Sequence, residues 1–387
     1  MYDAQNSKEA NFLQNLFSEY YKKHTISSVP SHEFREFGYG VYRKKIANRN
    51  MSFTTETEMN YFLRNSAPLF FSYSNAYYKH PASTPMPTKE LFKADIIYEF
   101  DADELGLEVP VINNIQWFDI EHIDAAKKQV HKLLSFIEND FNFSREGLAI
   151  NFSGKAGFHV HLRGKEIQEL KKKARIELVD YLTAQNMDYI NLGFDLDSLL
   201  APKPLGLWQK RLYEGIKEFF KKDASEIAKF TGFQKKKISS ITNDIPAILS
   251  SLDKGVLVQL DGRKSADFWK KVLDSIVEKE KCPIDRQTSI DLHKIIRVPQ
   301  TLHGDTGFIA KTLTLDELNS FNPYTDAVVF DNVFAKSVEI DKVKVLVKEA
   351  PKFNLLNESF GPFKEEEVEL PLYAAVYLIG KGTATLK

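Results

Sequence analysis

The chain has 387 residues, 43% of them hydrophobic, and its 52 Lys and Arg nearly balance its 53 Asp and Glu, which leaves a net charge of −1. This length allows a sizeable core, in one large domain with an insertion or in two to three domains. The balanced charge excludes a global positive field, so any nucleic-acid binding must use local patches.

Cysteine content and hydropathy exclude further classes. The single cysteine, Cys282, excludes a disulfide framework and a zinc site built on several thiolates. No run of about 18 apolar residues is present, so no membrane span is expected. The first residues lack the basic-then-apolar layout of a signal peptide. We therefore expect a soluble, intracellular protein of the cytoplasm or nucleoid.

The first hundred residues combine helical and strand patterns. Apolar residues recur at helical spacing over 8–24, and alternation over 33–53 predicts strands with a basic loop. A short helix is expected over 55–65 and a proline-rich linker over 80–90. Residues 93–101 are apolar enough for a buried strand, which ends at a pair of aspartates.

This pair, Asp101 and Asp103, is the first candidate site. On a strand, residues i and i+2 point the same way, so both carboxylates are expected on one face. Two such anions are costly unless a cation lies between them, and oxygen ligands suit Mg²⁺ or Mn²⁺. The alternative is a solvent-exposed pair that caps the next turn. We expect that role for the second Asp-x-Asp pair, Asp195 and Asp197, which has no phosphate-binding motif nearby.

A second motif follows a helix predicted over 119–141. Two strands, Leu148–Phe152 and Phe158–Leu162, flank a glycine turn and predict a hairpin. Ser153, Lys155 and the turn glycines suit phosphate binding, because glycine lets the backbone approach closely. His159 and His161 share one strand face. Two alternatives stay open for them, a solvent-facing pair and a transition-metal site.

The next part of the chain is mostly helical. A helix is expected over about 165–186, and the helical period over 199–255 predicts an all-α insertion between the two parts of a core formed by 1–198 and 256–387. The lysine runs at 171–173 and 235–237 are either solvated helix faces or nucleic-acid contacts. After a further helix, strands are expected around Val343–Val347. Together the elements predict an α/β (α+β) fold with a mixed sheet.

The third motif begins at Asp285, a possible third carboxylate. Lys294 to His303 then supplies two cations, a proline-fixed turn and an imidazole, and Arg297 could pair bidentately with a phosphate. The alternative is a surface helix that ends at Pro299, with His303 buried and satisfied. Taken together, the three motifs supply what nucleotide transfer requires, carboxylates for metals and polar or cationic donors for a triphosphate.

In this order the motifs resemble those of the catalytic small subunit of the archaeal–eukaryotic type DNA primase. That family has paired aspartates, then Ser-Gly-x-x-Gly-x-His, then an Asp followed 18 residues later by the His that ends a basic-x-Pro-x-x-x-His segment. Asp101 and Asp103 match the first motif, Ser153 to His159 the second, and Asp285 with His303 the third, since 303 − 285 = 18.

The resemblance implies a primase catalytic core that synthesises short RNA primers from NTPs on a single-stranded DNA template during DNA replication. It implies Mg²⁺ or Mn²⁺ held by a triad of Asp101, Asp103 and Asp285. It also implies nucleotide-phosphate contacts from a second set of residues, with Arg49 as a weaker candidate: Ser153, Lys155, His159, Arg297 and His303.

The resemblance further implies a heterodimer with a primase large subunit. We expect that partner to dock on an apolar patch, either the stretch Leu370–Leu378 or the helical insertion.

The chain departs from the family pattern at two places. Residues 104–145 contain no Cys where members usually carry a Cys/His zinc-binding element, so no structural zinc is expected. The positions after Ser153-Gly154 are often both basic in the family, and here they are Lys155 and Ala156.

Three other functions stay open at this point. One is a primase-polymerase or repair polymerase that prefers dNTPs. Another is a non-catalytic nucleic-acid-binding subunit, and the third is a metal phosphohydrolase that uses His159 and His161.

Overall fold

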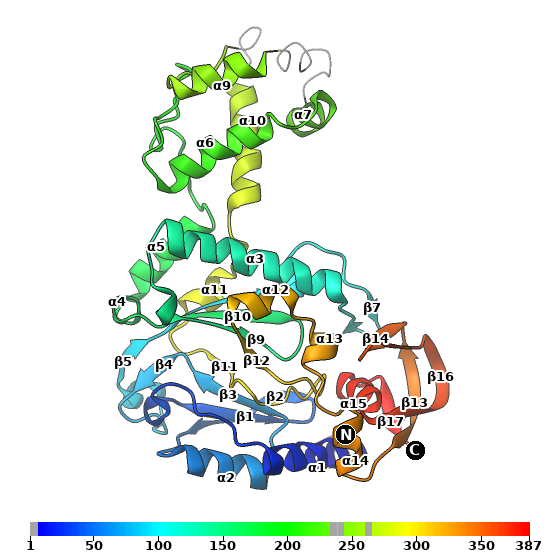
Figure 1. Cartoon of the computed structure of the whole chain (residues 1–387). Helices are drawn as coiled ribbons and strands as arrows, with labels where there is room; N and C mark the ends of the chain where they lie inside the picture. The colour runs from blue at the N-terminus through cyan, green and yellow to red at the C-terminus, as the bar shows by residue number, and fades with distance from the viewer. Residues whose placement is uncertain (1–6, 233–237, 239–243, 260–264) are drawn as a thin grey trace. The chain divides into compact units, whose positions relative to one another are not determined.

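The structure is a computed structural model that describes residues 7–232, 238, 244–259 and 265–387 (Figure 1). It mixes helices with several separate sheets, which confirms the predicted α/β (α+β) class. The chain forms two compact units. The first comprises residues 1–131, 144–176 and 283–387, and the second comprises 132–143 and 177–282. The predicted insertion, 199–255, lies within the second unit, which also takes in residues on both sides of it.

The first unit holds the sheets. Its strands are β1 (Phe37–Val41), β2 (Lys44–Met51), β3 (Phe70–Ser74), β4 (Ala76–Tyr78), β5 (Leu91–Ala94), β6 (Ile96–Asp101), β7 (Val111–Ile112), β8 (Ile115–Gln116), β9 (Leu148–Phe152), β10 (Gly157–Leu162), β11 (Ile295–Arg297), β12 (Lys311–Leu313), β13 (Lys342–Ala350), β14 (Phe353–Leu355), β15 (Glu358–Phe360), β16 (Phe363–Pro371) and β17 (Ala384–Leu386). Its α-helices are α1 (Lys8–Lys23), α2 (Glu56–Ser66), α4 (Lys165–Gln168), α11 (Arg286–Ile290), α12 (Leu315–Ser320), α13 (Pro323–Asp326), α14 (Asn332–Ser337) and α15 (Leu372–Lys381). Short 3₁₀ helices are η2 (His32–Phe34), η3 (Met86–Lys89), η4 (Ala102–Glu104) and η5 (Arg145–Gly147). Two α-helices contribute residues to both units, α3 (Ile120–Asn139) and α5 (Lys172–Leu182).

One four-stranded sheet has the order β11-β3-β1-β2, and α1 and α2 lie along one side of it (Figure 1). Phe62 of α2 packs on this sheet, with its ring 5.4 Å from that of Tyr39 and 5.9 Å from that of Phe71. Ser7 and Thr55 cap the two helices by accepting hydrogen bonds from first-turn amides, as their residue types favour. Because β11 pairs with β3, this sheet brings Arg297 opposite Ser72.

The second four-stranded sheet has the order β12-β9-β10-β6. It contains the predicted hairpin, since β9 and β10 pair in antiparallel register around the glycine turn. On the other side, β10 pairs with β6 so that Gly157 lies opposite Asp101 and His159 lies opposite Glu99. The glycine turn and the aspartate pair, far apart in sequence, therefore meet at one end of this sheet.

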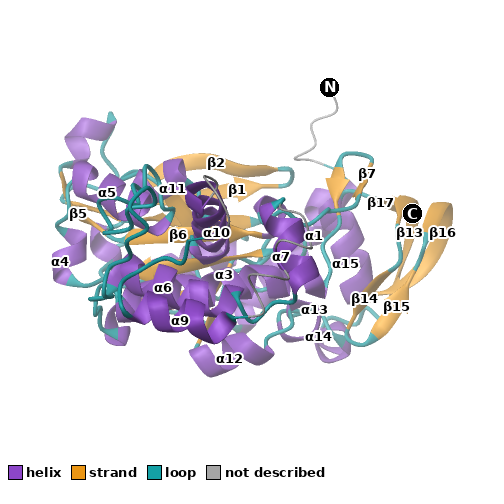
Figure 2. Ribbon diagram, turned by 90° about the horizontal axis from the view of Figure 1, so that it is seen from above, coloured by secondary structure: helices purple, strands orange, loops and turns teal. Residues whose placement is uncertain are grey.

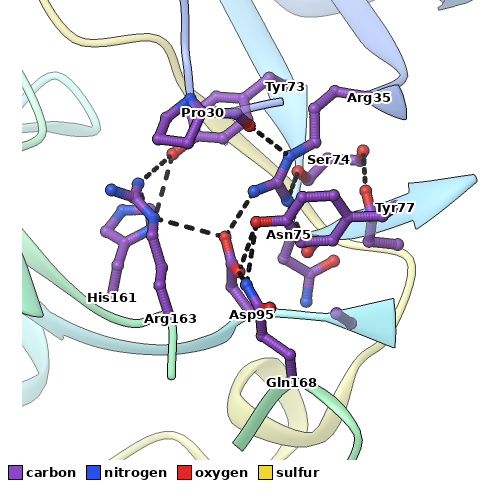
Figure 3. A network of polar contacts seen from close by, with 12 residues as sticks. Pro30, Arg35, Tyr73, Ser74, Asn75, Tyr77, Asp95, His161, Arg163 and Gln168 are labelled. Carbon is purple, nitrogen blue, oxygen red and sulfur yellow. Dashed lines mark hydrogen bonds and ion pairs between the residues drawn. The ribbon is translucent and has the colours of Figure 1, made fainter. Parts of the chain in front are cut away.

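A buried polar network stabilises the first unit around Asp95, just before β6 (Figure 3). Arg35 pairs with Asp95 at 2.7 Å, and both side chains are fully buried. Tyr77 and Gln168 also donate to Asp95, at 3.0 and 2.7 Å. Because a buried carboxylate is costly unless it is fully hydrogen-bonded, removing Arg35 should destabilise this unit strongly.

A three-stranded sheet, β16-β13-β17, packs with α15 at one edge of the first unit (Figure 2). The stretch Leu370–Leu378, which the sequence offered as a docking patch, contributes most of α15, and every residue from Leu372 to Lys381 is buried. That expectation is wrong, because the helix is apolar all round and serves as core rather than as an exposed face.

The described residues of the second unit are mostly helical from Leu207 onward. Its helices are α6 (Leu207–Phe219), α7 (Ala224–Thr231), α9 (Ile245–Asp253) and α10 (Ser265–Glu280). An added Cβ at Gly215 would lie 2.3 Å from Ile276, so this glycine allows α6 and α10 to approach closely. No helix among the described residues is long and apolar enough to span a membrane.

Candidate active site

A cavity of about 300 Å³ opens in the first unit where the ends of β6 and β11 approach the glycine turn. Seven of the eight site residues predicted from the sequence line it, and they come from all three motifs: Asp101, Asp103, Ser153, Lys155, His159, Arg297 and His303. The eighth, Asp285, does not line the cavity. It directly precedes α11, which packs against β6.

The carboxylates form one edge of this cavity. Asp101 ends β6, whereas Asp103 lies in the 3₁₀ helix η4. The expectation that both side chains share a strand face is therefore wrong, although both still line the same cavity. An added Cβ at Gly157 would lie 2.2 Å from Oδ1 of Asp101, so the missing side chain at Gly157 makes room for this carboxylate.

The carboxylates repel one another. Burial raises the pKa of Asp101; His159 opposes the shift, and Glu99 and Asp103 add to it. Burial also raises the pKa of Glu104, to which the charges of Asp101 and Asp285 contribute. Asp285 therefore belongs to the same negative field despite its place outside the cavity wall. A cation near Asp101 would relieve this field.

The residues fit a hard divalent cation. The acidic edge offers carboxylate oxygens, which Mg²⁺ and Mn²⁺ prefer, and no thiolate. Among the described residues, no three His, Cys, Asp or Glu side chains already converge on one point at metal-binding distance. Substrate phosphates and water commonly complete the coordination of such ions, so two aspartates and a nearby third are a plausible protein share.

The glycine turn is held by its own serine and by the third motif. Ser153 Oγ accepts hydrogen bonds from the amides of Lys155 and Gly157, at 3.4 and 3.3 Å. Gly154 has φ +87°, and an added Cβ there would lie 2.8 Å from Cβ of His303. Thr306 Oγ1 donates to the Gly154 carbonyl at 2.6 Å. The second and third motifs are therefore in direct contact, which only glycine at 154 permits.

Another part of the cavity wall carries buried polar nitrogens without partners among the described residues. Nε and Nη1 of Arg297 and Nδ1 of His159 are buried and have no hydrogen-bond partner among the described residues. Burial lowers the pKa of His159, and it lowers the pKa of Arg297 to about 10. Unpaired buried donors are costly, and an incoming anion such as a phosphate would satisfy them.

His303 and Lys155 complete this wall. Nδ1 of His303 accepts from the Asp305 amide at 3.2 Å, which places the proton of the neutral ring on Nε2. Burial holds the pKa of His303 well below its usual range, and Arg297 and Lys45 lower it further. Lys155 lies 4.0 Å from Asp305 and is only partly buried. A neutral imidazole donor beside two cations is suited to triphosphate oxygens.

His161 has a different environment from His159, although they share a strand face. His159 faces Glu99 at 3.6 Å in the cavity. His161 is fully buried in the polar network, where Nδ1 lies 3.5 Å from the hydroxyl of Tyr73 and 3.4 Å from Arg163 (Figure 3). The structure thus gives the two histidines separate partners and lends no support to a shared transition metal.

Several basic residues named in the sequence take structural places. Arg49 pairs with the buried Glu36 at 2.8 Å and does not line the cavity. The run 171–173 is exposed, but Arg175 after it is buried and donates to the carbonyls of Ala94 and Asp95. The other lysine run, 235–237, lies outside the described residues.

Sequence reasoning missed several residues that line the cavity, among them Lys45, Ser72, Gln116 and Phe118. Lys45 belongs to a basic segment that the sequence did single out, but the spacing between motifs offered no reason to choose it. Ser72 reaches the cavity only because β3 pairs with β11. Gln116 and Phe118 lie in a segment without any motif.

Comparisons with known proteins point to one family. A family model described as DNA primase small subunit matches residues 118–315. The chain is 31% identical to the DNA primase small subunit of Methanothrix thermoacetophila, over 98% of this chain and 99% of the relative. It is 28% identical to that of Archaeoglobus fulgidus, over 97% and 98% of the two chains. It is 27% identical to that of Methanocella arvoryzae, over 98% and 99%.

Proposed function

The chain belongs to the DNA primase small subunit family, and from this premise we propose that it joins nucleotides in the 300 Å³ cavity with two divalent ions held by three aspartates. As a primase subunit it is a nucleotidyltransferase that makes primers. The ligands that we propose for Mg²⁺ or Mn²⁺ are Asp101, Asp103 and Asp285. Such ions lower the pKa of an attacking 3′-hydroxyl and offset charge on departing pyrophosphate.

The donors that line the same cavity would then bind the triphosphate. Arg297 presents two unpartnered N–H groups, which suit bidentate pairing with phosphate oxygens. His303 offers the N–H of Nε2, and Nδ1 of His159 is buried with no partner among the described residues. Lys155 adds a mobile point charge at the rim, and Ser153 keeps the turn in shape through its two amide contacts. Bound this way, the triphosphate would lie between the donors and the carboxylates, as transfer requires.

One observation carries this proposal. A single cavity is lined by mutually repelling carboxylates and by Arg297, whose buried Nε and Nη1 have no partner among the described residues, and a metal-bound triphosphate would satisfy both. Without a ligand, both the repelling carboxylates and the unpaired donors raise the free energy of the fold.

A template-directed synthesis assay tests the function and its alternatives together. The chain is incubated with single-stranded DNA, Mg²⁺ or Mn²⁺, and either NTPs or dNTPs. We expect primers made from NTPs only when template is present. Synthesis from dNTPs alone would identify a polymerase of the primase-polymerase kind. Nucleotide hydrolysis without template would indicate a phosphohydrolase, and no reaction with bound DNA would indicate a non-catalytic subunit.

We also assign to this chain a large-subunit partner that docks on the second unit. Leu205 is 93% exposed and Leu207 is 51% exposed, and both line a groove of about 510 Å³ together with Trp208. An exposed apolar patch of this kind is unfavourable in water and typical of interfaces. With Leu370–Leu378 buried, this patch is the remaining one of the two proposed from the sequence.

A pair of charge substitutions tests the docking site. Leu205→Asp combined with Leu207→Asp should abolish copurification with the large subunit and reduce de novo primer synthesis by the mixture, while extension of a supplied primer continues. Val333→Asp is the matched control, because Val333 is 77% exposed on α14 in the first unit. Loss of binding in the control, or its retention in the double variant, would contradict the assignment.

A further inference from the structure

A small hairpin follows Asp101 and Asp103 in the sequence and precedes α3. Its strands β7 and β8 pair Val111 with Gln116 and Ile112 with Ile115. The two turn residues, Asn113 and Asn114, have φ values of +51° and +62°, which a two-residue type I′ turn requires and asparagine tolerates. Because turn type sets the register of a hairpin, the Asn113-Asn114 turn determines which face of the hairpin Gln116 occupies.

Gln116 contacts a proposed metal ligand. Its Nε2 donates to Oδ2 of Asp103 at 3.1 Å, and its side chain lines the cavity. Asp103 lies in η4, outside the strand ladder, and is exposed. Hydrogen bonds to a metal-ligating carboxylate orient it and tune its affinity. An ionised carboxylate has about four acceptor positions, so this bond leaves room for a cation.

Gln116 is itself held by the C-terminal helix. Nζ of Lys381, the last residue of α15, donates to the Gln116 carbonyl at 2.8 Å, across 265 positions of sequence. The lysine is 9% exposed, and its Nζ lies 4.7 Å from the ring centre of Trp117 and 5.2 Å from that of Tyr377. Burial and, to a smaller extent, the charge of Lys155 lower the pKa of Lys381 to about 7. Its placement is therefore costly for stability.

The residues after Gln116 are anchored as well. The Trp117 amide donates to the Pro110 carbonyl at 2.9 Å, and the buried Trp117 ring packs 5.9 Å from Phe353. The Phe118 carbonyl accepts from the Tyr324 hydroxyl at 2.6 Å. Three consecutive residues beside the carboxylates are thus held by distant parts of the first unit, so the Gln116 amide is pre-organised.

We propose that Gln116 is a positioning residue for nucleotide transfer: its amide orients the Asp103 carboxylate toward a divalent cation, and Lys381 keeps Gln116 in place through the backbone carbonyl. This inference rests on the proposed role of Asp103 in metal binding. It adds a contribution from the C-terminal helix to a site otherwise built from the three sequence motifs.

Titration of the full chain with Mn²⁺, followed by electron paramagnetic resonance without nucleotide or DNA, tests the contact to Asp103. Gln116→Met keeps the side-chain length and removes the donor, so we expect about 10-fold weaker Mn²⁺ binding. Glu349→Ala is the matched control, because it breaks the 2.9 Å contact of Asn113 at the hairpin tip and spares Gln116. The control should bind Mn²⁺ like the wild type.

Primer extension adds a second readout. For Gln116→Met, the Mn²⁺ concentration at half-maximal rate should rise about 10-fold, while kcat at saturating Mn²⁺ recovers. A residue needed only for the fold would lower kcat at every Mn²⁺ concentration. That result would overturn the positioning role.

A double-variant cycle tests the Lys381 arm. Lys381→Met should weaken Mn²⁺ binding in the same direction, and Gln116→Met combined with Lys381→Met should bind no more weakly than Gln116→Met alone. Lys127→Met is the matched control, since Lys127 is 7% exposed on α3 and pairs with Asp124 instead. Losses that multiply in the double variant would show that Lys381 does not act through Gln116. Should Lys381→Met unfold, the Gln116→Met result decides the proposal alone.

Asp103→Ala separates a failure of this inference from a failure of the proposed function. If Asp103→Ala binds Mn²⁺ as tightly as the wild type, the assignment of the metal site is wrong. If Asp103→Ala loses Mn²⁺ while folded Gln116→Met stays within about twofold of the wild type, the metal site stands and the role of Gln116 is wrong.

Discussion

The chain contains two Asp-x-Asp segments, and the structure treats them differently. In the second unit, Oδ1 of Asp195 accepts the amides of Asp197 and Ser198 at 3.1 and 3.0 Å, which is the turn chemistry expected from the sequence. In the first unit, Asp101 and Asp103 line a cavity beside further carboxylates. Backbone amides stabilise the Asp195 carboxylate, whereas burial and neighbouring carboxylates leave Asp101 to be stabilised by an incoming cation.

The pKa shifts of Asp195 and Asp101, the first aspartate of each pair, run in opposite directions. Hydrogen bonds from Ser198 lower the pKa of Asp195. Burial raises the pKa of Asp101, and neighbouring carboxylates add to the shift. A carboxylate stabilised by the fold serves structure, whereas one destabilised by it is poised for a ligand. The predictions below test this contrast, from the largest expected effect to the smallest.

Metal removal should have the largest effect, because activity depends on a metal at Asp101 and Asp103 whereas the fold does not. Chelation with EDTA should abolish primer synthesis and leave the thermal midpoint of unfolding nearly unchanged, because the fold is held by its own contacts. Elemental analysis of the purified chain should find no stoichiometric zinc. One zinc per chain, or unfolding on chelation, would contradict the account.

Alanine substitutions should reduce activity at one set of aspartates and stability at the other. Asp101→Ala, Asp103→Ala or Asp285→Ala should lower the rate of primer synthesis by on the order of 10³-fold or more, with the fold retained. Asp195→Ala should instead lower stability slightly, because two amide contacts are lost, and leave the rate unchanged. Circular dichroism and primer extension on the same preparations measure both effects. Near-normal synthesis in any of the first three would remove that residue from the site.

Arg297 and Arg175 offer a parallel contrast. Arg297→Met should raise the KM for NTP by about 10- to 100-fold, as expected for a lost hydrogen bond to a charged group, with little loss of stability, since its donors lack protein partners. Arg175→Met should destabilise the chain, because its guanidinium holds the carbonyls of Ala94 and Asp95. Steady-state kinetics and urea unfolding distinguish the two. An unchanged KM in Arg297→Met would count against the phosphate site.

The pH dependence of stability should also differ in sign. The raised pKa of Asp101 means that the native state takes up its proton at a higher pH than the unfolded state does, so this group destabilises the fold at pH 7 and the penalty disappears as pH falls through the raised pKa. Asp101→Asn should therefore be more stable than the wild type at pH 7, by on the order of 1 kcal/mol, and the gain should shrink toward pH 4.

Asp195 should show the reverse. Its lowered pKa contributes stability that is present above the unfolded value of 3.8 and is lost as pH falls through the folded value. Asp195→Asn should be less stable than the wild type at pH 7, and the deficit should shrink only below pH 4. Urea unfolding at several pH values measures both differences. Curves of the same sign for the two variants would contradict the contrast.

Much of the site could be predicted from the sequence because its chemistry is concentrated in short segments. Gly154 and Gly157 reveal close approaches that only glycine permits, and the spacing of Asp285 and His303 preserved the order of the motifs. Asp103 was placed on the wrong kind of element, since nothing in Asp-Ala-Asp-Glu marks where β6 ends and a 3₁₀ turn begins. Both aspartates line the predicted site even though Asp103 does not lie on the strand.

Long-range contacts could not be predicted in the same way. Gln116 and Lys381 meet across 265 positions, and no motif connects them. The apolar residues of α15 looked like a possible docking face, because hydrophobicity alone does not distinguish a core helix from an interface helix. Only the packing of α15 with β13, β16 and β17 decides the question.

A crystal structure with Mn²⁺ and a nucleoside triphosphate bound would test the central claim most directly. We expect anomalous scattering from Mn²⁺ among Asp101, Asp103 and Asp285, the triphosphate on Arg297 and His303, and no metal at Asp195 and Asp197. Metal at the second aspartate pair, or a triphosphate bound outside the cavity, would contradict the account.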